Sequence, residues 1–399
     1  MKWTSAISEK SALNAALEEC GEQISEGLSG LTPDLVCLFV TPHYATEYAK
    51  ISDTVSRLLN AKVVFGCSGG GVIGSGKEVE FRPAISMSAA SLPGVDLLSF
   101  HLEENGLPDL DAAPEAWHHL ISQAPLEPTS ILLLADPFTF HAEPLIRGLD
   151  YAYPTTTKIG GLASGGRRPG QNLLLLSGQE HYSGAIGVAL QGNVAVEPIV
   201  AQGCRPIGPV LCITSCDQNL LIQLDGQPAL ELLQTLYQTL TEEDRYSATH
   251  SLFLGIAMDT FSENLGPGDF LVRNLLGIDP RTGVIGVGET LQEGQLVRFH
   301  IRDRETSRQD LVALLEPYQG YDRENPHSGC LMFSCLGRGE GLYGVPNHDS
   351  EVFANHLGNI PLTGFFCNGE IGPVGTETFL HGYTSAFGLF RPLINQATP

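Results

Sequence analysis

Short apolar runs alternate with amphipathic segments along most of the chain, a pattern that predicts strands and helices in turn. After an opening helix at residues 8–28, a buried strand is predicted within 33–44, a helix at 45–60 and a second strand within 62–76. The last of these segments ends in a glycine-rich loop. Strand, helix, strand and glycine-rich loop therefore form one unit of the predicted structure.

The same unit occurs three times. Apolar runs flank a helix again at 130–166 and at 329–375, and the three closing loops read GCSGGGVIG, GGLASGG and GFFCNGEIG. We interpret the recurrence as duplication of one unit. The alternative is convergence, because a strand that turns sharply also uses glycine for purely local reasons.

Two other apolar runs predict antiparallel pairs of strands. A Pro-Gly turn divides the run at 84–102, and Gln191-Gly192-Asn193 divides the run at 185–203. In each run the two strands are expected to pair with one another. The sheets are therefore predicted to be mixed.

The second half of the chain has its own pattern. After a boundary region at 203–225, an amphipathic helix at 228–240 precedes several short strands and a helix at 306–318. The predicted fold is α+β, with mixed, largely antiparallel sheets flanked by helices. We expect two related domains, at 1–210 and 211–399.

Charge narrows the range of partners. The chain has 22 basic and 45 acidic residues and a formal charge of −23, which repels nucleic acid and anionic membrane surfaces. No run approaches the roughly 18 apolar residues of a membrane-spanning helix, and the N-terminus lacks the apolar core of a signal peptide. We expect an acidic cytoplasmic protein without nucleic-acid binding or membrane insertion.

Most of the nine cysteines lie inside apolar runs, which fits buried, reduced thiols better than a disulfide framework. Cys212 and Cys216 have a spacing that a metal site could use, but no matching Cys or His pair follows closely. We expect neither a metal nor another cofactor.

Polar residues gather at the glycine-rich ends of the two C-terminal strands, where GCLMFSCLGRG and PLTGFFCNGEIGPVG close. Two strand ends that converge would form a cleft that glycine leaves open to a ligand. The candidate ligand-binding residues are Cys335, Gly337, Arg338, Gly339, Asn368, Gly369 and Glu370.

The charges in this set suit a zwitterion. Arg338 would hold a carboxylate in a bidentate fork, while Glu370 would receive an ammonium and Asn368 would supply a donor and an acceptor. A salt bridge between Arg338 and Glu370 that merely ties the two loops together explains the same residues at least as well.

Cys335 raises a second hypothesis. A nearby cation such as Arg338 increases the thiolate population, and a nucleophilic cysteine would need His381 or His348 as its base. No protease-type signature surrounds Cys335, so a structural or redox-responsive thiol is preferred to a catalytic one. A buried inert thiol is the simplest alternative.

The ordered motifs GCSGGG, GGLASGG, GCRPIGP, FSCLGRG, PLTGFFCNGEIGPVG and HGYTSAFGLF resemble those of the FIST family, over residues 35–389. The resemblance implies a bacterial sensory protein related to an F-box subunit, with FIST N and FIST C portions that meet near 203–225. It also implies an intracellular signalling role and a small ligand such as an amino acid. The chain resembles a stand-alone member, because it has room for no F-box, kinase or methyl-accepting segment.

Three functions follow from these observations. The first is a sensory module without catalytic activity that binds a small ligand in the glycine-loop cleft. The second is a cysteine-dependent enzyme that acts on acyl or amide bonds. The third is an adaptor that binds only proteins, because a chain without an output segment would signal through a partner. A homodimer is left open.

Overall fold

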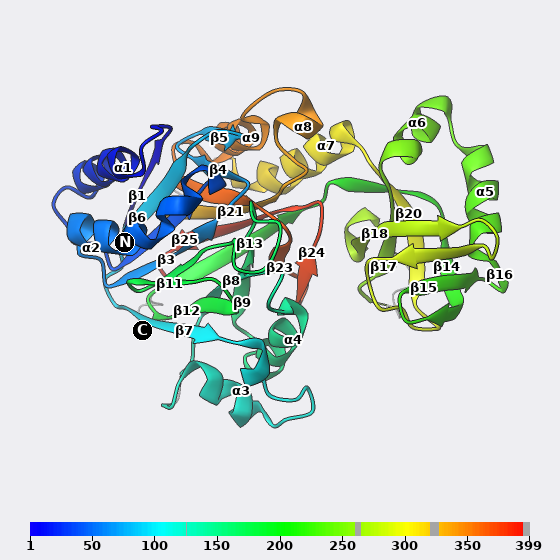
Figure 1. Ribbon diagram of the computed structural model, residues 1–399, viewed down its shortest axis with the longest axis horizontal. Coiled ribbons are helices and arrows are strands. Elements are labelled where there is room, and N and C mark those ends of the chain that lie inside the picture. Colours follow the sequence, from blue (N-terminus) through cyan, green and yellow to red (C-terminus); the bar gives the residue numbers. More distant parts are fainter. Residues whose placement is uncertain (125, 260–264, 320–326, 394–399) are drawn as a thin grey trace, which may run out of the picture. The chain divides into compact units, whose positions relative to one another are not determined.

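The computed structural model describes residues 1–399 apart from 125, 260–264, 320–326 and 394–399 (Figure 1). Its first compact unit comprises Met1–Ala201, Val312–Leu380 and Thr384–Pro399, and its second comprises Gln202–Leu311 and His381–Tyr383. Both units combine helices with mixed or antiparallel sheets, which confirms the predicted fold class. The division into domains at 1–210 and 211–399 stays a prediction, and the compact first unit draws on both ends of the chain.

Three six-stranded sheets occur in the described part of the first unit, and they share one strand order. In each sheet two antiparallel strands precede a parallel pair, and a two-stranded hairpin follows the pair. The first sheet is β1 (Lys2–Ser8), β6 (Ile85–Ser91), β2 (Leu35–Val40), β3 (Val63–Ser68), β10 (Leu174–Leu176) and β11 (Gln179–His181). The second is β7 (Val95–Leu102), β12 (Ala185–Gly192), β8 (Ser130–Ala135), β9 (Thr157–Leu162), β23 (Glu370–Val374) and β24 (Glu377–His381). The third is β13 (Ala195–Ala201), β25 (Ser385–Arg391), β21 (Gly329–Cys335), β22 (Leu362–Cys367), β4 (Gly71–Gly74) and β5 (Lys77–Glu80).

A helix connects the two strands of each parallel pair, as the sequence predicts. The connecting helices are α2 (Ile51–Leu59), α4 (Ala142–Ala152) and α9 (His348–Leu357), the last preceded by the short α8 (Glu340–Tyr343). α1 (Leu13–Leu28) packs against α2, and α3 (Pro114–Ile121) packs against α4. The strand–helix–strand segment therefore occurs three times in the structure, and we call each occurrence, with the hairpin that follows it, a repeat.

The hairpin that follows the second strand of each repeat completes the sheet of another repeat. The hairpin β4–β5 pairs with β22, β10–β11 pairs with β3, and β23–β24 pairs with β9. The exchange is cyclic, because every repeat gives one hairpin to a second repeat and receives one from the third. Each sheet therefore needs at least two separate stretches of sequence.

The central strands are buried on both faces, which explains their continuous apolar sequences. All six residues of β2, β3, β8 and β22 are buried. One core cluster joins side chains from all three sheets, and in it Phe39 stacks on Phe365 with ring centroids 4.8 Å apart. Two further clusters lie between sheets and helices, one with α1 and α2 and one with α3 and α4. These helices thus cover the outer faces, as expected.

One glycine occupies the same place in each parallel pair. A Cβ added to Gly66, Gly160 or Gly364 would lie 1.7 to 1.8 Å from a backbone oxygen of the neighbouring strand. These three glycines are the first residues of the loops GCSGGGVIG, GGLASGG and GFFCNGEIG. The shared position supports the interpretation of one repeated unit, since local turns alone would not place a glycine opposite the same point of each strand.

Both antiparallel pairings predicted between sequence neighbours are wrong. β6 pairs with β1 and β2, whereas β7 pairs with β12. β12 also pairs with β8, and β13 pairs with β25. A turn sequence indicates where the chain reverses, but the cyclic exchange of strands decides which edge each strand joins.

The second unit forms a closed ring of antiparallel strands in its described residues. The ring order is β14 (Cys204–Asp217), β20 (Leu296–Arg302), β17 (Leu252–Ala257), β18 (Phe270–Asp279), β19 (Val284–Val287) and β15 (Leu220–Leu224), with β16 (Gln227–Pro228) paired to β15. The long β14 closes the ring because it pairs with both β20 and β15. α5 (Ala229–Thr239) and α6 (Glu242–His250) are its helices, and α7 (Arg304–Leu315) begins in this unit and ends in the first. A separate core cluster confirms that this half has its own interior.

Within the described residues, no helix is both long and apolar enough to cross a membrane.

Gly364→Ala tests whether the recurring glycine is required by strand packing. We expect it to lower the free energy of unfolding by about 3 kcal/mol or more, because the added Cβ would meet backbone that cannot rotate away. Gly341→Ala is the matched control, since its Cβ would meet nothing within 4 Å, and should change stability by less than about 0.5 kcal/mol. Urea unfolding measures both. Equal stabilities of the two variants would contradict the packing argument.

Candidate functional site

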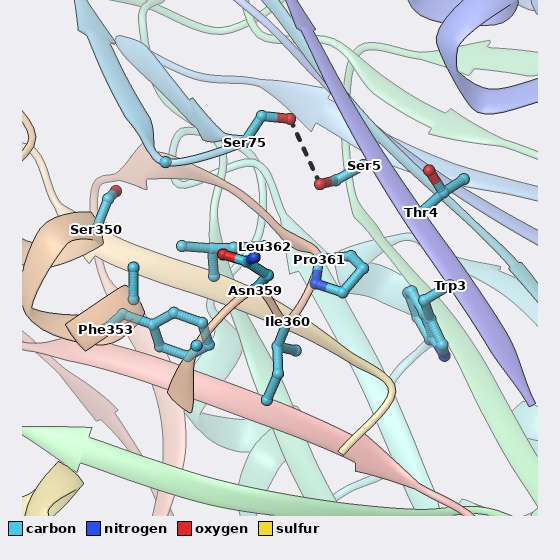
Figure 2. A pocket seen from close by; sticks show the side chains of 13 residues that line it. Trp3, Thr4, Ser5, Ser75, Ser350, Phe353, Asn359, Ile360, Pro361 and Leu362 are labelled. Carbon is cyan, nitrogen blue, oxygen red and sulfur yellow. Dashed lines mark hydrogen bonds between the residues drawn. The ribbon is translucent and has the colours of Figure 1, made fainter. Parts of the chain in front are cut away.

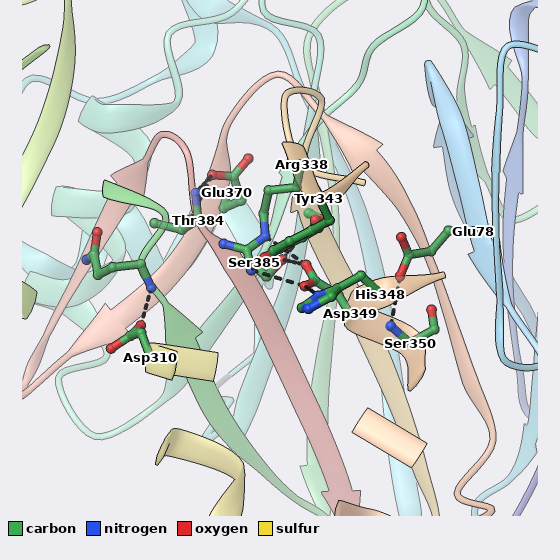
Figure 3. A network of polar contacts seen from close by, with 12 residues as sticks. Glu78, Asp310, Arg338, Tyr343, His348, Asp349, Ser350, Glu370, Thr384 and Ser385 are labelled. Carbon is green, nitrogen blue, oxygen red and sulfur yellow. Dashed lines mark hydrogen bonds and ion pairs between the residues drawn. The ribbon is translucent and has the colours of Figure 1, made fainter. Parts of the chain in front are cut away.

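A buried ion pair lies just beyond the end of β21. The Arg338 Nε donates to Asp349 Oδ2 at 2.7 Å, and Nη2 donates to Asp349 Oδ1 at 3.2 Å and to the Tyr343 hydroxyl at 2.6 Å (Figure 3). The Arg338 side chain is 0% exposed and that of Asp349 is 1% exposed. The planar guanidinium suits this two-point contact with a carboxylate.

Electrostatics keep both members of this pair charged. Burial by itself would raise the pKa of Asp349, but the charge and hydrogen bonds of Arg338, with His348, hold that pKa well below its usual range. Burial likewise opposes the charge of Arg338, and the Asp349 carboxylate outweighs it and raises the arginine pKa. Removing either charge would leave the other buried without its main counter-ion.

The remaining polar atoms around Asp349 also have partners. His348 Nδ1 lies 3.0 Å from Asp349 Oδ1, and its ring stacks on Tyr343 with centroids 3.6 Å apart. Ser385 donates to Asp349 Oδ2 at 3.2 Å, and its hydroxyl lies 2.8 Å from that of Ser334. The network therefore ties β21, α8, α9 and β25 together.

A second buried acid holds the start of α9. Glu78 Oε1, on β5, accepts from the Ser350 backbone N–H at 2.7 Å, while the Glu78 N–H donates to Asn347 Oδ1 at 2.8 Å. The first N–H groups of a helix have no partner within the helix, so this carboxylate acts as a cap from another repeat. Burial, followed by the nearby Asp349 charge, raises the pKa of Glu78 to about 7.

Glu370 is a third buried acid, at the start of β23. Its Oε2 accepts from the Thr384 N–H at 3.1 Å and from the Thr384 hydroxyl at 2.8 Å, and Cys367 Sγ lies 3.2 Å from Oε1. Burial raises the pKa of Glu370 to about 7, against the hydrogen bonds from Thr384 and Cys367. This carboxyl group is thus close to balance between its two protonation states at neutral pH.

Arg338 and Glu370 have other partners in the structure than those predicted from the sequence. Arg338 forms its ion pair with Asp349, and Glu370 binds Thr384 and Cys367. Both predicted residues are completely buried. This arrangement matches neither the open carboxylate clamp nor the tie between Arg338 and Glu370, because α9 places a carboxylate within reach that strand spacing alone does not reveal.

The glycines of the two loops make room for other parts of the chain. A Cβ at Gly339 would lie 2.3 Å from Glu80 Oε1, and the residue has a φ of +69°. Gly337 is half-buried in the same turn. The loop from β22 is fastened to β9, since Gly369 O accepts from the Leu162 N–H at 2.8 Å. Exposed Asn368 donates to Ala163 O at 3.1 Å.

The residues of the enzyme hypothesis are placed as follows. Cys335 ends β21, is half-buried, and lies opposite Cys367 in the strand register. His348 turns its Nδ1 to Asp349, and His381 is buried at the end of β24 in the second unit. A cysteine nucleophile with a histidine base therefore stays a prediction.

Sequence reasoning missed Asp349, Tyr343 and Glu78. Asp349 lies in the first turn of α9, one residue before the helix that the sequence predicts, and an acid is favourable at that end of a helix. Glu78 belongs to a hairpin far away in sequence, and no local pattern connects it with α9.

A cavity of about 380 Å³ lies beside α9 (Figure 2). We call it the α9 pocket, and its lining residues are Trp3, Thr4, Ser5, Ser75, Gly76, Ser350, Phe353, Ala354, Gly358, Asn359, Ile360, Pro361 and Leu362. The hydroxyls of Ser5 and Ser75 lie 3.5 Å apart at one side, and α9 supplies Ser350 and Phe353 at another. The pocket lies at the beginning of β22, whereas the predicted glycine-loop cleft would lie at the end of that strand. The pocket is therefore a different site from the predicted cleft.

Family models match most of the chain. The FIST N domain model matches residues 34–227 and the FIST C domain model matches residues 229–373. The chain belongs to the FIST family. FIST domains are sensory signal-transduction domains, so the sensory role expected from the resemblance is confirmed, while the ligand and the glycine-loop cleft stay predictions.

Two mycobacterial relatives align with almost the full length of this chain. The uncharacterized protein Rv0628c of Mycobacterium tuberculosis is 35% identical over 378 residues, which is 94% of this chain and 96% of the relative. The uncharacterized protein Mb0898c of Mycobacterium bovis is 34% identical over 382 residues, 95% and 96% of the two chains. An F-box/LRR-repeat protein of Arabidopsis thaliana is 22% identical over 317 residues, 67% of this chain and 58% of the plant protein. The expected relation to an F-box protein is confirmed.

Charge removal tests the ion pair of this FIST protein. We expect Arg338→Met alone, or Asp349→Leu alone, to cost about 3–5 kcal/mol of unfolding free energy, because each leaves a buried charge without its counter-ion. The double variant should lose much less than the sum of the two losses. Chemical unfolding of the four proteins in the cycle measures this coupling, and additive losses would show that the pair is not the stabilising interaction.

Glu370→Gln tests the raised pKa of its carboxyl group. The ordinary value is 4.5 and the folded value is about 7, so the folded state retains the proton better than the unfolded state. Its stabilising contribution is present below about pH 4.5 and is lost as pH rises through 7, by on the order of 3 kcal/mol. We expect the stability difference between the variant and the parent to change by this amount across that interval, in unfolding curves at a series of pH values. A constant difference would exclude a raised pKa.

Proposed function

We propose that this FIST protein is a sensory module that binds a small, uncharged polar compound in the α9 pocket. The observation that carries the proposal is that one helix lines the pocket and also holds the buried ion pair. A volume of about 380 Å³ falls within the range of known small-molecule sites. A change in the pocket therefore has a direct mechanical route to the charged network.

The lining chemistry supports an uncharged ligand. None of the thirteen residues that line the pocket has an ionisable side chain, whereas four hydroxyl groups and the Asn359 amide offer hydrogen bonds. Phe353, Ile360 and Pro361 add apolar surface. A free amino acid would bring two charges that these side chains leave without counter-ions, at a cost in desolvation. We therefore favour a neutral polar compound over the amino acid expected from the sequence.

The route from pocket to network runs along α9. Ser350 lines the pocket and donates its backbone N–H to Glu78, and its neighbour Asp349 binds Arg338. One turn later, Phe353 lines the pocket and stacks on Phe387 of β25, with centroids 5.8 Å apart and planes at 5°. A ligand that moves α9 would alter the helix cap, the ion pair and this aromatic contact together. Such a movement would be the signal passed to a protein partner.

Blocking the pocket tests the proposal. We expect Ala354→Phe, at the rim, to weaken binding of a ligand by about tenfold or more through steric exclusion. Asn355→Phe places the same ring on the same helix at an exposed residue outside the lining, and it should bind like the parent. Calorimetry is run with neutral sugars, polyols and nucleosides, and with free amino acids as the charged comparison.

Three outcomes would contradict the proposal. These are silence of every neutral compound, equal binding by Ala354→Phe and the parent, and preference for free amino acids that Ala354→Phe leaves intact. The last of these would return the ligand to another site, such as the glycine loops.

A further inference from the structure

Two cysteines end neighbouring strands at the same level. Cys335 of β21 and Cys367 of β22 are direct partners in a parallel pair. Neighbouring strands lie about 4.8 Å apart, which is inside the roughly 4.4–6.8 Å range of Cα separations that a disulfide spans. Phe333 and Phe365, two residues earlier on each strand, both point into the shared core, so the two cysteines also lie on one face.

The two thiols differ in access. Cys335 is half-buried, whereas Cys367 is completely buried in the core shared by the three sheets. A small reagent would therefore reach Cys335 first. All nine cysteines are described as thiols. The same core also contains Cys37 and Cys67, both completely buried, and of these two Cys67 interacts electrostatically with Cys367.

Charged groups lie beside both thiols. The Arg338 backbone N–H donates to Cys335 O at 2.8 Å, which holds the two residues in one tight turn. Electrostatic interaction with Cys335 is also among the causes that raise the pKa of the Arg338 guanidinium. A cation that interacts with a thiol favours the thiolate, which is the reactive form. At the other strand, Cys367 Sγ lies 3.2 Å from Glu370 Oε1 and 3.2 Å from Ser334 O. A proton acceptor is thus in contact with the second thiol.

We propose that Cys335 and Cys367 form a peroxide-responsive thiol pair that closes into a disulfide. The inference is independent of the α9 pocket and its ligand. It assigns a redox function to the strand ends where the sequence placed a ligand cleft, and it gives Glu370 a role that the ion pair does not use.

The proposed reaction has two steps, with a hydroperoxide as the oxidant. The Cys335 thiolate attacks one peroxide oxygen, an S–O bond forms, the O–O bond breaks, and hydroxide or alkoxide leaves with the two electrons. Glu370 then takes the proton of Cys367, whose sulfur attacks the sulfur of Cys335. The S–S bond forms as the S–O bond breaks, and the departing hydroxide takes the proton from Glu370 and becomes water. A dithiol reverses the change by returning two electrons.

Peptide mapping after treatment with hydrogen peroxide tests the pair in the full chain. Trypsin cuts after Arg338 and leaves Cys330 and Cys335 in one peptide and Cys367 in the next. We expect a linked peptide in the parent and in Cys330→Ser, and loss of the link in Cys335→Ser. In Cys367→Ser, Cys335 should accumulate as sulfenic acid, which dimedone traps about tenfold faster than any sulfenic acid at the half-buried Cys212.

Folding is checked for each reduced variant by circular dichroism and thermal unfolding, and the parent alone supplies a readout free of substitutions. A parent whose Cys335 is oxidised no faster than Cys212 would overturn the proposal. A link that joins Cys367 to Cys67 or Cys330, or that persists in Cys335→Ser, would overturn it as well.

Discussion

The exchange of hairpins among the three repeats is the constraint on which the first unit depends. Each parallel pair has one edge that is completed by strands from another repeat, through β4–β5, β10–β11 and β23–β24. Buried strands need partners for their backbone N–H and C=O groups, so a repeat without the hairpin of its neighbour would leave those groups unpaired. The shared aromatic core adds a second reason, because it draws side chains from all three sheets. The repeats are therefore expected to fold as one cooperative body.

This exchange also brings the candidate site together. Glu78 is on a hairpin of the first repeat, but that hairpin pairs with β22 of the third, so its carboxylate reaches the start of α9. Asp349, one residue before the capped Ser350, then meets Arg338 from the turn after β21. The buried charges are acceptable because each has hydrogen-bonding partners from several elements. α9 is consequently held by groups from two repeats, and its residues Ser350, Phe353 and Ala354 line the α9 pocket.

Two buried carboxyl groups with a pKa of about 7 lie on opposite ends of this arrangement. Burial and the charge of Asp349 raise the pKa of Glu78, and burial is the main cause of the raised pKa of Glu370. Their ionisation near neutral pH opposes folding, and the surrounding network offsets this cost. Groups of this kind also suit proton transfer, because a small change in environment moves their charge. The ion pair and the two cysteines lie along β21, α9 and β22, whereas the pocket is lined by α9 and the start of β22 together with residues of β1 and of the turn between β4 and β5.

Local patterns of residues were enough to predict the secondary structure and the family. Apolar runs and glycine loops predicted three units of strand, helix and strand, and the first glycine of each loop, such as Gly364, is the one that a Cβ would push into neighbouring backbone. The C-terminal motifs indicated FIST, whereas ligand binding by Arg338 and Glu370 stays a prediction. Periodicity works at this level because burial on one face or both is a local property of a strand or helix.

The pairing of strands and of charged side chains depends instead on the three-dimensional arrangement of the chain. β6 and β7 are separated by a short turn but belong to different sheets, and β12 and β13 also belong to different sheets. Asp349 became the partner of Arg338 because α9 returns over the end of β21, and Glu78 arrived through an exchanged hairpin. Contacts between residues far apart in sequence depend on which edges remain unpaired and which charges must be neutralised, and neither quantity is written in a local pattern of residues.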